Sequence, residues 1–392
     1  MKKDFLNFQA QTTPHPLLEE VVEAKGSYIY TSDGKAHLDF VAGVSACGLG
    51  HQHPAVIKAI KNQLDKYMHV MVYGEYALAP AVKYCKLLAE NLPPTLQSTY
   101  LVNSGTEAID GAMKLARRVT GRTQIIAAKN AYHGNSYGAL SLMDYKERTT
   151  PFEPLVGDIT HIEFNNPACF SVITKNTAAV ILETIQGGAG FILPQKDYLI
   201  NIKKRCEEVG ALLILDEIQP GFGRTGKLFG FEHFGITPDI VVIGKAMASG
   251  LPCGAFISSY ELMNTLSHQP KLGHITTFGG NPVIASAALA TLKFLLESQL
   301  IEQSLVKEQL FRSLLNHPLI TEIRGKGLML ALIFNTEEQA NQLVLKAKEE
   351  GLILFWLLFE KKAVRISPPL NISNEEIKKG CQLIIQILNQ FN

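Results

Sequence analysis

Two residues could together act on an amine, because each follows a short apolar run. Asp216 directly follows the run 211–215, and Lys245 comes two residues after the run 240–243, with Gly244 between them. Such runs are typical of buried strands, so both side chains are expected at strand ends. A lysine amine can form a Schiff base with the aldehyde of pyridoxal phosphate, while a carboxylate can keep the pyridine nitrogen protonated. Taken singly, each residue is more simply explained as a solvated lysine or a capping aspartate.

Further candidates follow other predicted strands, where a flat, phosphorylated cofactor could bind. The run 100–102 leads into a turn of small residues and then a helix, whose free N–H groups suit a phosphate. An aromatic residue after the run 125–127 could stack on a ring. The candidates are Ser104, Gly105, Thr106, Tyr132, His133, Glu183, Ile218, Gln219 and, in a turn before a long helix, Thr277. One at a time, these segments also fit helix caps and packing aromatics.

The elements that must position these residues form an α/β pattern. Apolar runs alternate with helical segments, which is typical of a mostly parallel sheet covered by helices on both faces. Ligands of such sheets bind at the carboxyl ends of the strands, where the candidates lie. Strand signals near the N-terminus, and mixed helices and strands after a long helix over 282–297, predict a second, α+β unit. We therefore expect a large domain over 46–285 and a small domain from 1–45 and 286–392.

Length and composition restrict the class of protein. With 392 residues, 46% hydrophobic and 19% charged, the chain is globular and long enough for two domains. The 37 basic and 36 acidic residues nearly balance, so we expect no nucleic-acid partner. Scattered cysteines without paired spacing argue for free thiols in a reducing compartment and against a bound metal. Because no apolar run is long enough for a signal peptide or a membrane span, we expect a cytoplasmic protein with no membrane partner.

In chain order, these segments resemble the class III aminotransferases, the ornithine, acetylornithine and 4-aminobutyrate group of fold-type I pyridoxal phosphate enzymes. The resemblance covers nearly the whole chain and rests on motifs that stand in the family's order. These are LDFVAG and GHQHP at 38–54, NSGTEA at 103–108, YHG at 132–134, LDEIQ at 215–219, GRTG at 223–226, GK at 244–245, TFGGNP at 277–282 and VRISPPL at 364–370. Each motif is weak alone, but their order and spacing together are very specific.

The resemblance implies a role for each matching residue. Lys245 would hold the cofactor as a Schiff base and then move a proton between substrate carbon and cofactor, which needs an amine of lowered pKa. Asp216 would pair with the pyridinium nitrogen. The phosphate would bind at Gly105 and Thr106, and Thr277 would arrive from the partner subunit of a homodimer. The remaining implied contacts are Tyr132 and Ile218 on the two ring faces, Gln219 at the ring hydroxyl, Glu183 as support, and Arg365 on a substrate carboxylate.

Three departures from the family pattern concern the substrate. Many relatives that use ω-amino acids have an arginine where this chain has Asn135, and they commonly have a second glutamate where it has Gly188. Ornithine-specific relatives place a tyrosine at the position of Val44. A donor carboxylate at residue 135 would lose a charge-assisted pairing of about 1.5–3 kcal/mol. We therefore expect a donor that is neutral or cationic at that end, with Tyr73 as a further candidate for the pocket wall.

The resulting hypothesis is an aminotransferase with a ping-pong cycle, a primary amine donor, and 2-oxoglutarate or pyruvate as acceptor. An aminomutase or racemase of the same fold is the alternative, although aminomutase relatives usually lack the GRTG motif present at 223–226. A nicotinamide-dependent oxidoreductase would need a Gly-x-Gly-x-x-Gly turn after an early strand, and the sequence has none. A binding protein without turnover is disfavoured by the presence of both Lys245 and Asp216.

Overall fold

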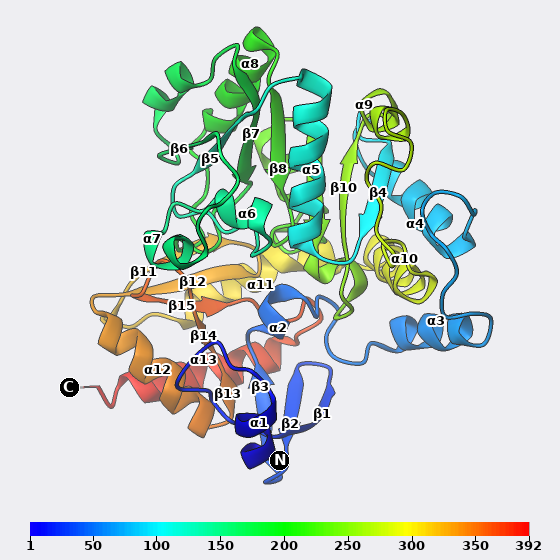
Figure 1. Ribbon diagram of the computed structural model, residues 1–392. Coiled ribbons are helices and arrows are strands. Elements are labelled where there is room, and N and C mark those ends of the chain that lie inside the picture. Colours follow the sequence, from blue (N-terminus) through cyan, green and yellow to red (C-terminus); the bar gives the residue numbers. More distant parts are fainter. Residues whose placement is uncertain (392) are drawn as a thin grey trace.

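The computed structural model describes residues 1–391 and contains three β-sheets (Figure 1). The largest is a seven-stranded sheet with the order β4-β10-β9-β8-β7-β5-β6. Its strands are β4 (Ser98–Val102), β5 (Gln124–Ala128), β6 (Ile159–Ile162), β7 (Thr177–Glu183), β8 (Leu212–Asp216), β9 (Ile240–Gly244) and β10 (Gly254–Ser258). Neighbours from β9 to β6 are parallel, and β10 runs antiparallel to both β9 and β4. The prediction of a mostly parallel sheet is confirmed.

Helices cover this sheet, because its central strands are apolar on both faces. Every residue of β7, β9 and β10 is buried, so each strand must bury its apolar side chains on two sides. Helix α5 (Gly105–Thr120) crosses one face in Figure 1 and buries one apolar side, including Ile109, Met113 and Leu115. The other helices of this region are α6 (Tyr137–Ser141), α7 (Lys146–Thr149), α8 (Tyr198–Val209) and α9 (Tyr260–Asn264).

A long apolar helix, α10 (Pro282–Glu297), lies against α3 (Pro54–Leu64) and α4 (Ala79–Ala89). Asn281 caps its start by accepting hydrogen bonds from the Val283 and Ile284 amides, and its bounds match the predicted helix. No single helix in residues 1–391 has the length and apolar character to cross a membrane. Within the same residues, one pair of consecutive helices is long and apolar enough when taken together. This pair is α10 and α11 (Leu300–Leu314), and the two helices are bent by 70° relative to each other.

The rest of the chain forms two four-stranded sheets and their helices. One sheet has the order β1-β2-β3-β13 and the other β11-β12-β15-β14. The strands are β1 (Val21–Lys25), β2 (Tyr28–Thr31), β3 (Ala36–Asp39), β11 (Ile320–Lys326), β12 (Met329–Phe334), β13 (Leu352–Ile353), β14 (Phe355–Trp356) and β15 (Ala363–Ile366). The helices are α1 (Lys2–Phe8), α2 (Ala42–Ser45), α12 (Glu337–Glu349) and α13 (Asn374–Leu388).

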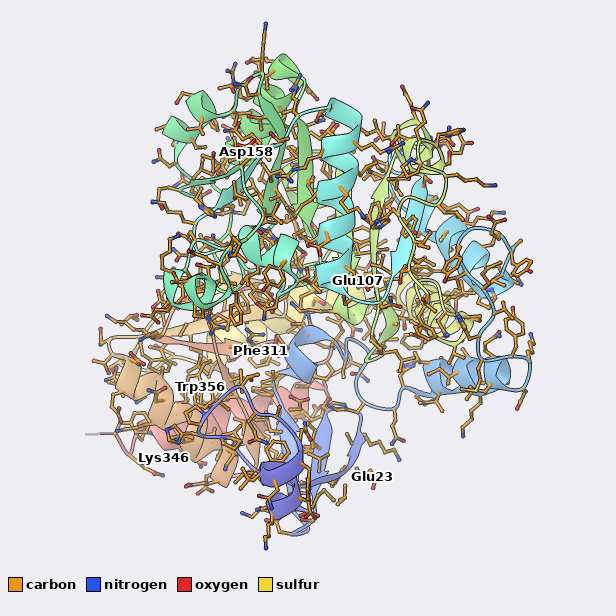
Figure 2. All side chains as sticks on the ribbon, viewed as in Figure 1. Glu23, Glu107, Asp158, Phe311, Lys346 and Trp356 are labelled. Atoms are coloured by element: carbon orange, nitrogen blue, oxygen red, sulfur yellow. The ribbon has the colours of Figure 1, made fainter. Side chains whose placement is uncertain are left out.

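The two ends of the chain meet in this second region. Strand β13 pairs in parallel with β3, so segments from both ends share one sheet. Phe311 of α11, labelled in Figure 2, packs edge-on against Phe40 with ring centroids 5.3 Å apart. This arrangement agrees with a small unit assembled from both chain ends, while the proposed boundaries at 46 and 285 stay a prediction. Strands β1, β6, β11, β12 and β14 were not predicted, because short apolar runs do not distinguish strands from buried helix segments.

Candidate active site

Three functional candidates meet at one edge of the large sheet, because they end neighbouring parallel strands. Glu183 is the last residue of β7 and lies opposite Asp216, the last residue of β8. Lys245 follows Gly244, the last residue of β9, which pairs in parallel with β8. The carboxyl ends of parallel strands share one edge, so the order of the strands brings the three side chains together.

Asp216 is buried and makes an ion pair with a buried histidine. Its Oδ2 lies 2.8 Å from His133 Nδ1, and its Oδ1 accepts a hydrogen bond of 2.9 Å from the Ile218 amide. Burial disfavours a charged imidazole, but the hydrogen bond and charge of Asp216 outweigh it and raise the pKa of His133. His133 Nε2 is buried without a hydrogen-bond partner in residues 1–391. The pair therefore holds the Asp216 carboxylate in a fixed position at the edge of the sheet.

Lys245 has a left-handed backbone conformation and an amine whose pKa is lowered. Its φ of +45° lies in the left-handed region, which costs a residue with a side chain about 1–3 kcal/mol and is common at functional sites. The side chain is partly accessible from a cavity, although its amine is enclosed by protein. Burial, reinforced by the cation of Arg365, lowers the pKa of Lys245 to about 8, against the opposing charges of Asp216 and Glu183. A substantial fraction of this amine is therefore neutral near pH 8.

Glu183 holds two loops in place. Its carboxylate accepts hydrogen bonds from the Tyr132 amide at 3.2 Å and from the Gly187 amide at 3.0 Å. Burial raises the pKa of Glu183 to about 7, with Asp216 adding to this effect and His133 opposing it. Both carboxylate oxygens therefore bind the backbone, and the supporting role of Glu183 in the site stays a prediction.

The N-terminus of α5 offers an anion site beside these residues. The first helical amides, of Gly105 and Thr106, have no carbonyl one turn earlier within the helix. Ser104 caps the helix by accepting a hydrogen bond from the Glu107 amide at 3.2 Å. The Thr106 hydroxyl already bonds Ser136, with the two oxygens 2.6 Å apart. The amides rather than this hydroxyl are therefore the free donors for an anion.

Arg365 lies in the same cavity without a protein partner for most of its guanidinium. It is 5% exposed, and its Nε and one terminal nitrogen are buried without a hydrogen bond in the described residues. Its guanidinium carbon lies 5.8 Å from the centre of the Phe191 ring. Burial lowers the pKa of Arg365 to about 10, which leaves it charged at neutral pH. The planar guanidinium has the geometry to bind a carboxylate through two parallel hydrogen bonds.

These residues surround one cavity of about 500 Å³. Its lining includes most of the predicted site residues, namely Val44, Gly105, Thr106, Tyr132, His133, Asn135, Glu183, Asp216, Ile218, Gln219, Lys245 and Arg365. It also includes Gly188, the position of the second departure from the family pattern, and residues that were not predicted, namely Gly134, Pro220, Phe355, Trp356 and Leu358. The aromatic segment FWLLF at 355–359 stands shortly before Arg365 in the sequence, a signal that could have identified this wall.

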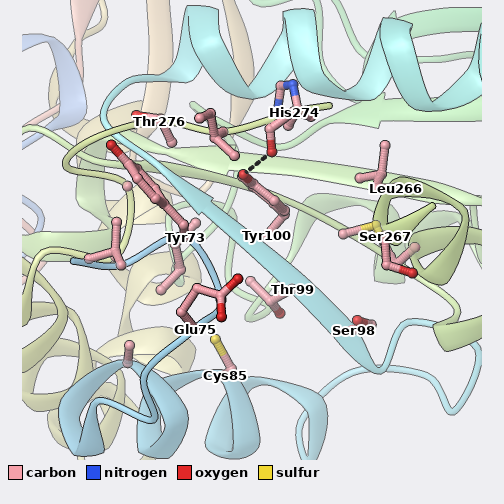
Figure 3. A pocket seen from close by; sticks show the side chains of 18 of the residues that line it. Tyr73, Glu75, Cys85, Ser98, Thr99, Tyr100, Leu266, Ser267, His274 and Thr276 are labelled. Carbon is pink, nitrogen blue, oxygen red and sulfur yellow. Dashed lines mark hydrogen bonds between the residues drawn. The ribbon is translucent and has the colours of Figure 1, made fainter. Parts of the chain in front are cut away.

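Tyr73 and Thr277 are not among the residues that line this cavity. Tyr73 lines a second cavity of about 770 Å³, which Figure 3 shows from close by. Thr277 is exposed and follows Thr276, whose hydroxyl accepts a 2.7 Å hydrogen bond from Asn103. Tyr100 anchors the same segment by donating a 2.6 Å hydrogen bond to the His274 carbonyl (Figure 3). The structure of one chain therefore leaves these two residues outside the site at Lys245.

Comparison with known proteins agrees with this geometry. The family model described as aminotransferase class-III matches residues 9–388. An acetylornithine aminotransferase from Methanopyrus kandleri is 36% identical and aligns over 92% of both chains. A structure of the ornithine aminotransferase from Toxoplasma gondii has a TM-score of 0.91 and 29% sequence identity, and the match covers 98% of this chain and 93% of that one. Pyridoxal phosphate partially occupies the active site of that structure. A thermostable omega transaminase mutant from Pseudomonas jessenii has a TM-score of 0.89 at 25% identity, over 99% of this chain and 97% of its own.

The fold and the cavity define a pyridoxal phosphate-dependent enzyme of fold type I. The chain belongs to the class III aminotransferases, which transfer an amino group from an amine donor to an oxo acid. The residues present fit the cofactor, since one cavity holds a lysine of lowered pKa, a carboxylate paired with a buried histidine, and free helix amides for a phosphate. In addition, a Cβ at Gly105 would lie 2.7 Å from the Ile218 side chain, so the backbone of the anion site packs against the residue expected on one ring face.

Proposed function

We propose that this chain transfers the amino group of a primary amine to an oxo acid such as 2-oxoglutarate or pyruvate in a ping-pong cycle, with Lys245 as the amine that holds the cofactor. The observation that carries this proposal is the position of Lys245, directly after β9 and in the same cavity as Asp216. Among the described residues that line the cavity, Lys245 is the one lysine, and its lowered pKa of about 8 favours the nucleophilic neutral amine.

Bound pyridoxal phosphate would supply an electron sink for the electron pair left when a substrate carbon loses its proton. The position of Asp216 supports a role in holding the pyridine nitrogen protonated, with His133 keeping its carboxylate oriented. The amides of Gly105 and Thr106 would hold the phosphate at the start of α5.

Other lining residues would position the ring. Tyr132 and Ile218 would contact its two faces, and Gln219 would approach its hydroxyl. Gln219 donates a 3.4 Å hydrogen bond to Ser45, which supports a fixed side chain. Glu183 would keep the Tyr132 backbone in place rather than take part in the chemistry.

Lys245 would also move the proton. Once substrate displaces it from the cofactor, its Nζ is an amine of lowered pKa that can take the proton from the substrate carbon and return it elsewhere. Burial favours the neutral amine, which is the form that accepts a proton. Arg365 would hold a substrate carboxylate, while Asn135 and Val44 would lie along the rest of the substrate.

We also propose a homodimer in which Thr277 completes the phosphate site of the partner subunit. Thr277 is exposed and outside its own chain's cavity, as such a role requires. The surface around the second cavity carries several exposed large apolar side chains, a feature of subunit interfaces. They are Tyr76, Val82, Tyr260, Leu272 and Ile275, with Met68, Met71 and Phe278 nearby in the chain. A cytoplasmic location is supported by six cysteines that are all free thiols.

The transfer can be tested with a donor whose amine nitrogen carries an isotope label. The holoenzyme would be incubated with a panel of labelled amines and either 2-oxoglutarate or pyruvate, with Lys245→Ala as the control. We expect the label in glutamate or alanine, measured by mass spectrometry, and none with the variant. Label retained in a rearranged or inverted donor would instead support an aminomutase or racemase.

A further inference from the structure

One wall of the cavity is apolar and belongs to the segment 355–359, which packs against Gly188. The Phe359 amide donates a 2.9 Å hydrogen bond to the Gly188 carbonyl. A Cβ at Gly188 would lie 2.8 Å from the Phe359 ring and 3.6 Å from Leu358, so a side chain at residue 188 would collide with this segment. The segment 355–359 can therefore approach the cavity because residue 188 has no side chain.

The aromatic part of this wall is held in place by its own contacts. The indole of Trp356 donates a 2.7 Å hydrogen bond to Asn341, and its ring packs edge-on against Phe355 with centroids 5.1 Å apart. The Phe359 ring lies 5.4 Å from that of Tyr145. A ligand in the cavity thus meets a fixed surface of Phe355, Trp356 and Leu358, and none of the three bears a charge.

Most of the acidic and basic groups around the cavity already have a protein partner or a role with the cofactor. Four lining residues other than histidine have acidic or basic side chains, namely Glu183, Asp216, Lys245 and Arg365. Both carboxylates already have protein partners, because Asp216 pairs with His133 and Glu183 binds backbone amides. Lys245 is assigned to the cofactor. Among the described lining residues, Arg365 is therefore the one charge left for a substrate, and its guanidinium lacks a protein partner at two nitrogens.

Resting on the proposed transamination, we infer that the enzyme takes substrates with a single carboxylate and an uncharged, apolar remainder. The carboxylate binds Arg365, and the remainder lies on the wall formed by Phe355, Trp356 and Leu358. A second carboxylate, as in 2-oxoglutarate, would be desolvated without a cation to receive it, and a second ammonium group would lack a free carboxylate. Of the two acceptors considered above, this favours pyruvate.

Equilibrium binding of unreactive ligands tests this inference on the holoenzyme. Trp356 is the chain's one tryptophan and lines the cavity, so its fluorescence reports occupancy without any turnover. The probes are pentanoate, glutarate and 3-phenylpropionate. Pentanoate and glutarate have the same chain length and differ by a terminal methyl or carboxylate. We expect pentanoate to bind at least about tenfold more tightly than glutarate, and 3-phenylpropionate to bind at least as tightly as pentanoate.

Paired variants test the role of residue 188. Phe359→Ala makes room for a side chain, so Gly188→Glu and Gly188→Gln would each be combined with it. The two double variants differ in one charge at nearly equal volume. We expect the glutamate variant to bind pentanoate about tenfold more weakly than the glutamine variant, because its carboxylate repels the ligand and competes for Arg365.

Two results would overturn the inference. One is glutarate binding to the wild-type enzyme as tightly as pentanoate, and the other is equal pentanoate binding by the two double variants. If neither double variant folds, the wild-type ligand series still decides the matter. Glutarate preference in an enzyme that transfers labelled nitrogen through Lys245 would refute the substrate class alone, whereas absent transfer would refute the proposed function.

Discussion

The ionisation of Lys245 leads to the sharpest prediction, which concerns the variant Arg365→Met. Burial and the Arg365 cation lower the pKa of Lys245 to about 8. At pH 7 about one such amine in ten is neutral, compared with about one in three thousand for a lysine of ordinary pKa. Replacing Arg365 removes its positive charge, which is the second-largest cause of the lowered pKa of Lys245. We therefore expect the pKa of Lys245 to rise in this variant.

The assay is the initial rate at which cofactor-free protein captures pyridoxal phosphate, followed by absorbance between about pH 7 and 10. Capture requires the neutral amine, so the wild-type rate should rise with pH and level off above its midpoint near 8. In Arg365→Met the midpoint should move to higher pH. Lys307→Met is the matched control, because Lys307 is another buried lysine with a pKa of about 8 and lies outside the cavity. A wild-type midpoint near 10, or a midpoint that Arg365→Met leaves unchanged, would refute the reasoning.

Three further variants test other parts of the site. Asp216→Asn breaks the buried pair with His133, so urea unfolding should show a loss of about 3–5 kcal/mol; stability equal to wild type would argue against an ionised pair. Ser104→Ala removes the cap of α5 and should lower the free energy of unfolding by about 1 kcal/mol, and a gain in stability would contradict the capping geometry. Thr277 lies outside the cavity of its own chain, but Thr277→Ala should still raise the dissociation constant of the cofactor in the dimer, measured by titration. An unchanged dissociation constant would count against a site shared between subunits.

The residues at the strand ends could be located from the sequence, because local signals determine them. Asp216 and Lys245 each follow an apolar run, and parallel neighbours place such residues at one edge of the sheet. The small residues 104–106 precede a strongly periodic helix, so the anion site at the start of α5 was also accessible to prediction. What the residues alone left open was whether each candidate belongs to a site or is a helix cap or packing residue, and the resemblance supplied their individual roles.

The apolar wall of the cavity could not be predicted in the same way. Its position depends on the contact between Gly188 and Phe359, which are far apart in the sequence and meet through tertiary packing. The glycine at residue 188 is a departure from the family pattern that the sequence shows. That it makes room for the Phe359 ring follows only from the tertiary structure. Strand β14 contains two residues, too few for a periodic pattern to show which side chains face the cavity.

Chemical fixation of the cofactor tests the central claim about Lys245 most directly. The holoenzyme would be treated with borohydride, digested, and its peptides sequenced by mass spectrometry, with Lys245→Ala treated in parallel. We expect the mass of reduced pyridoxal phosphate on the peptide that contains Lys245 and no labelled peptide from the variant. A label on another lysine, or a wild-type protein that takes up no cofactor, would contradict the assignment.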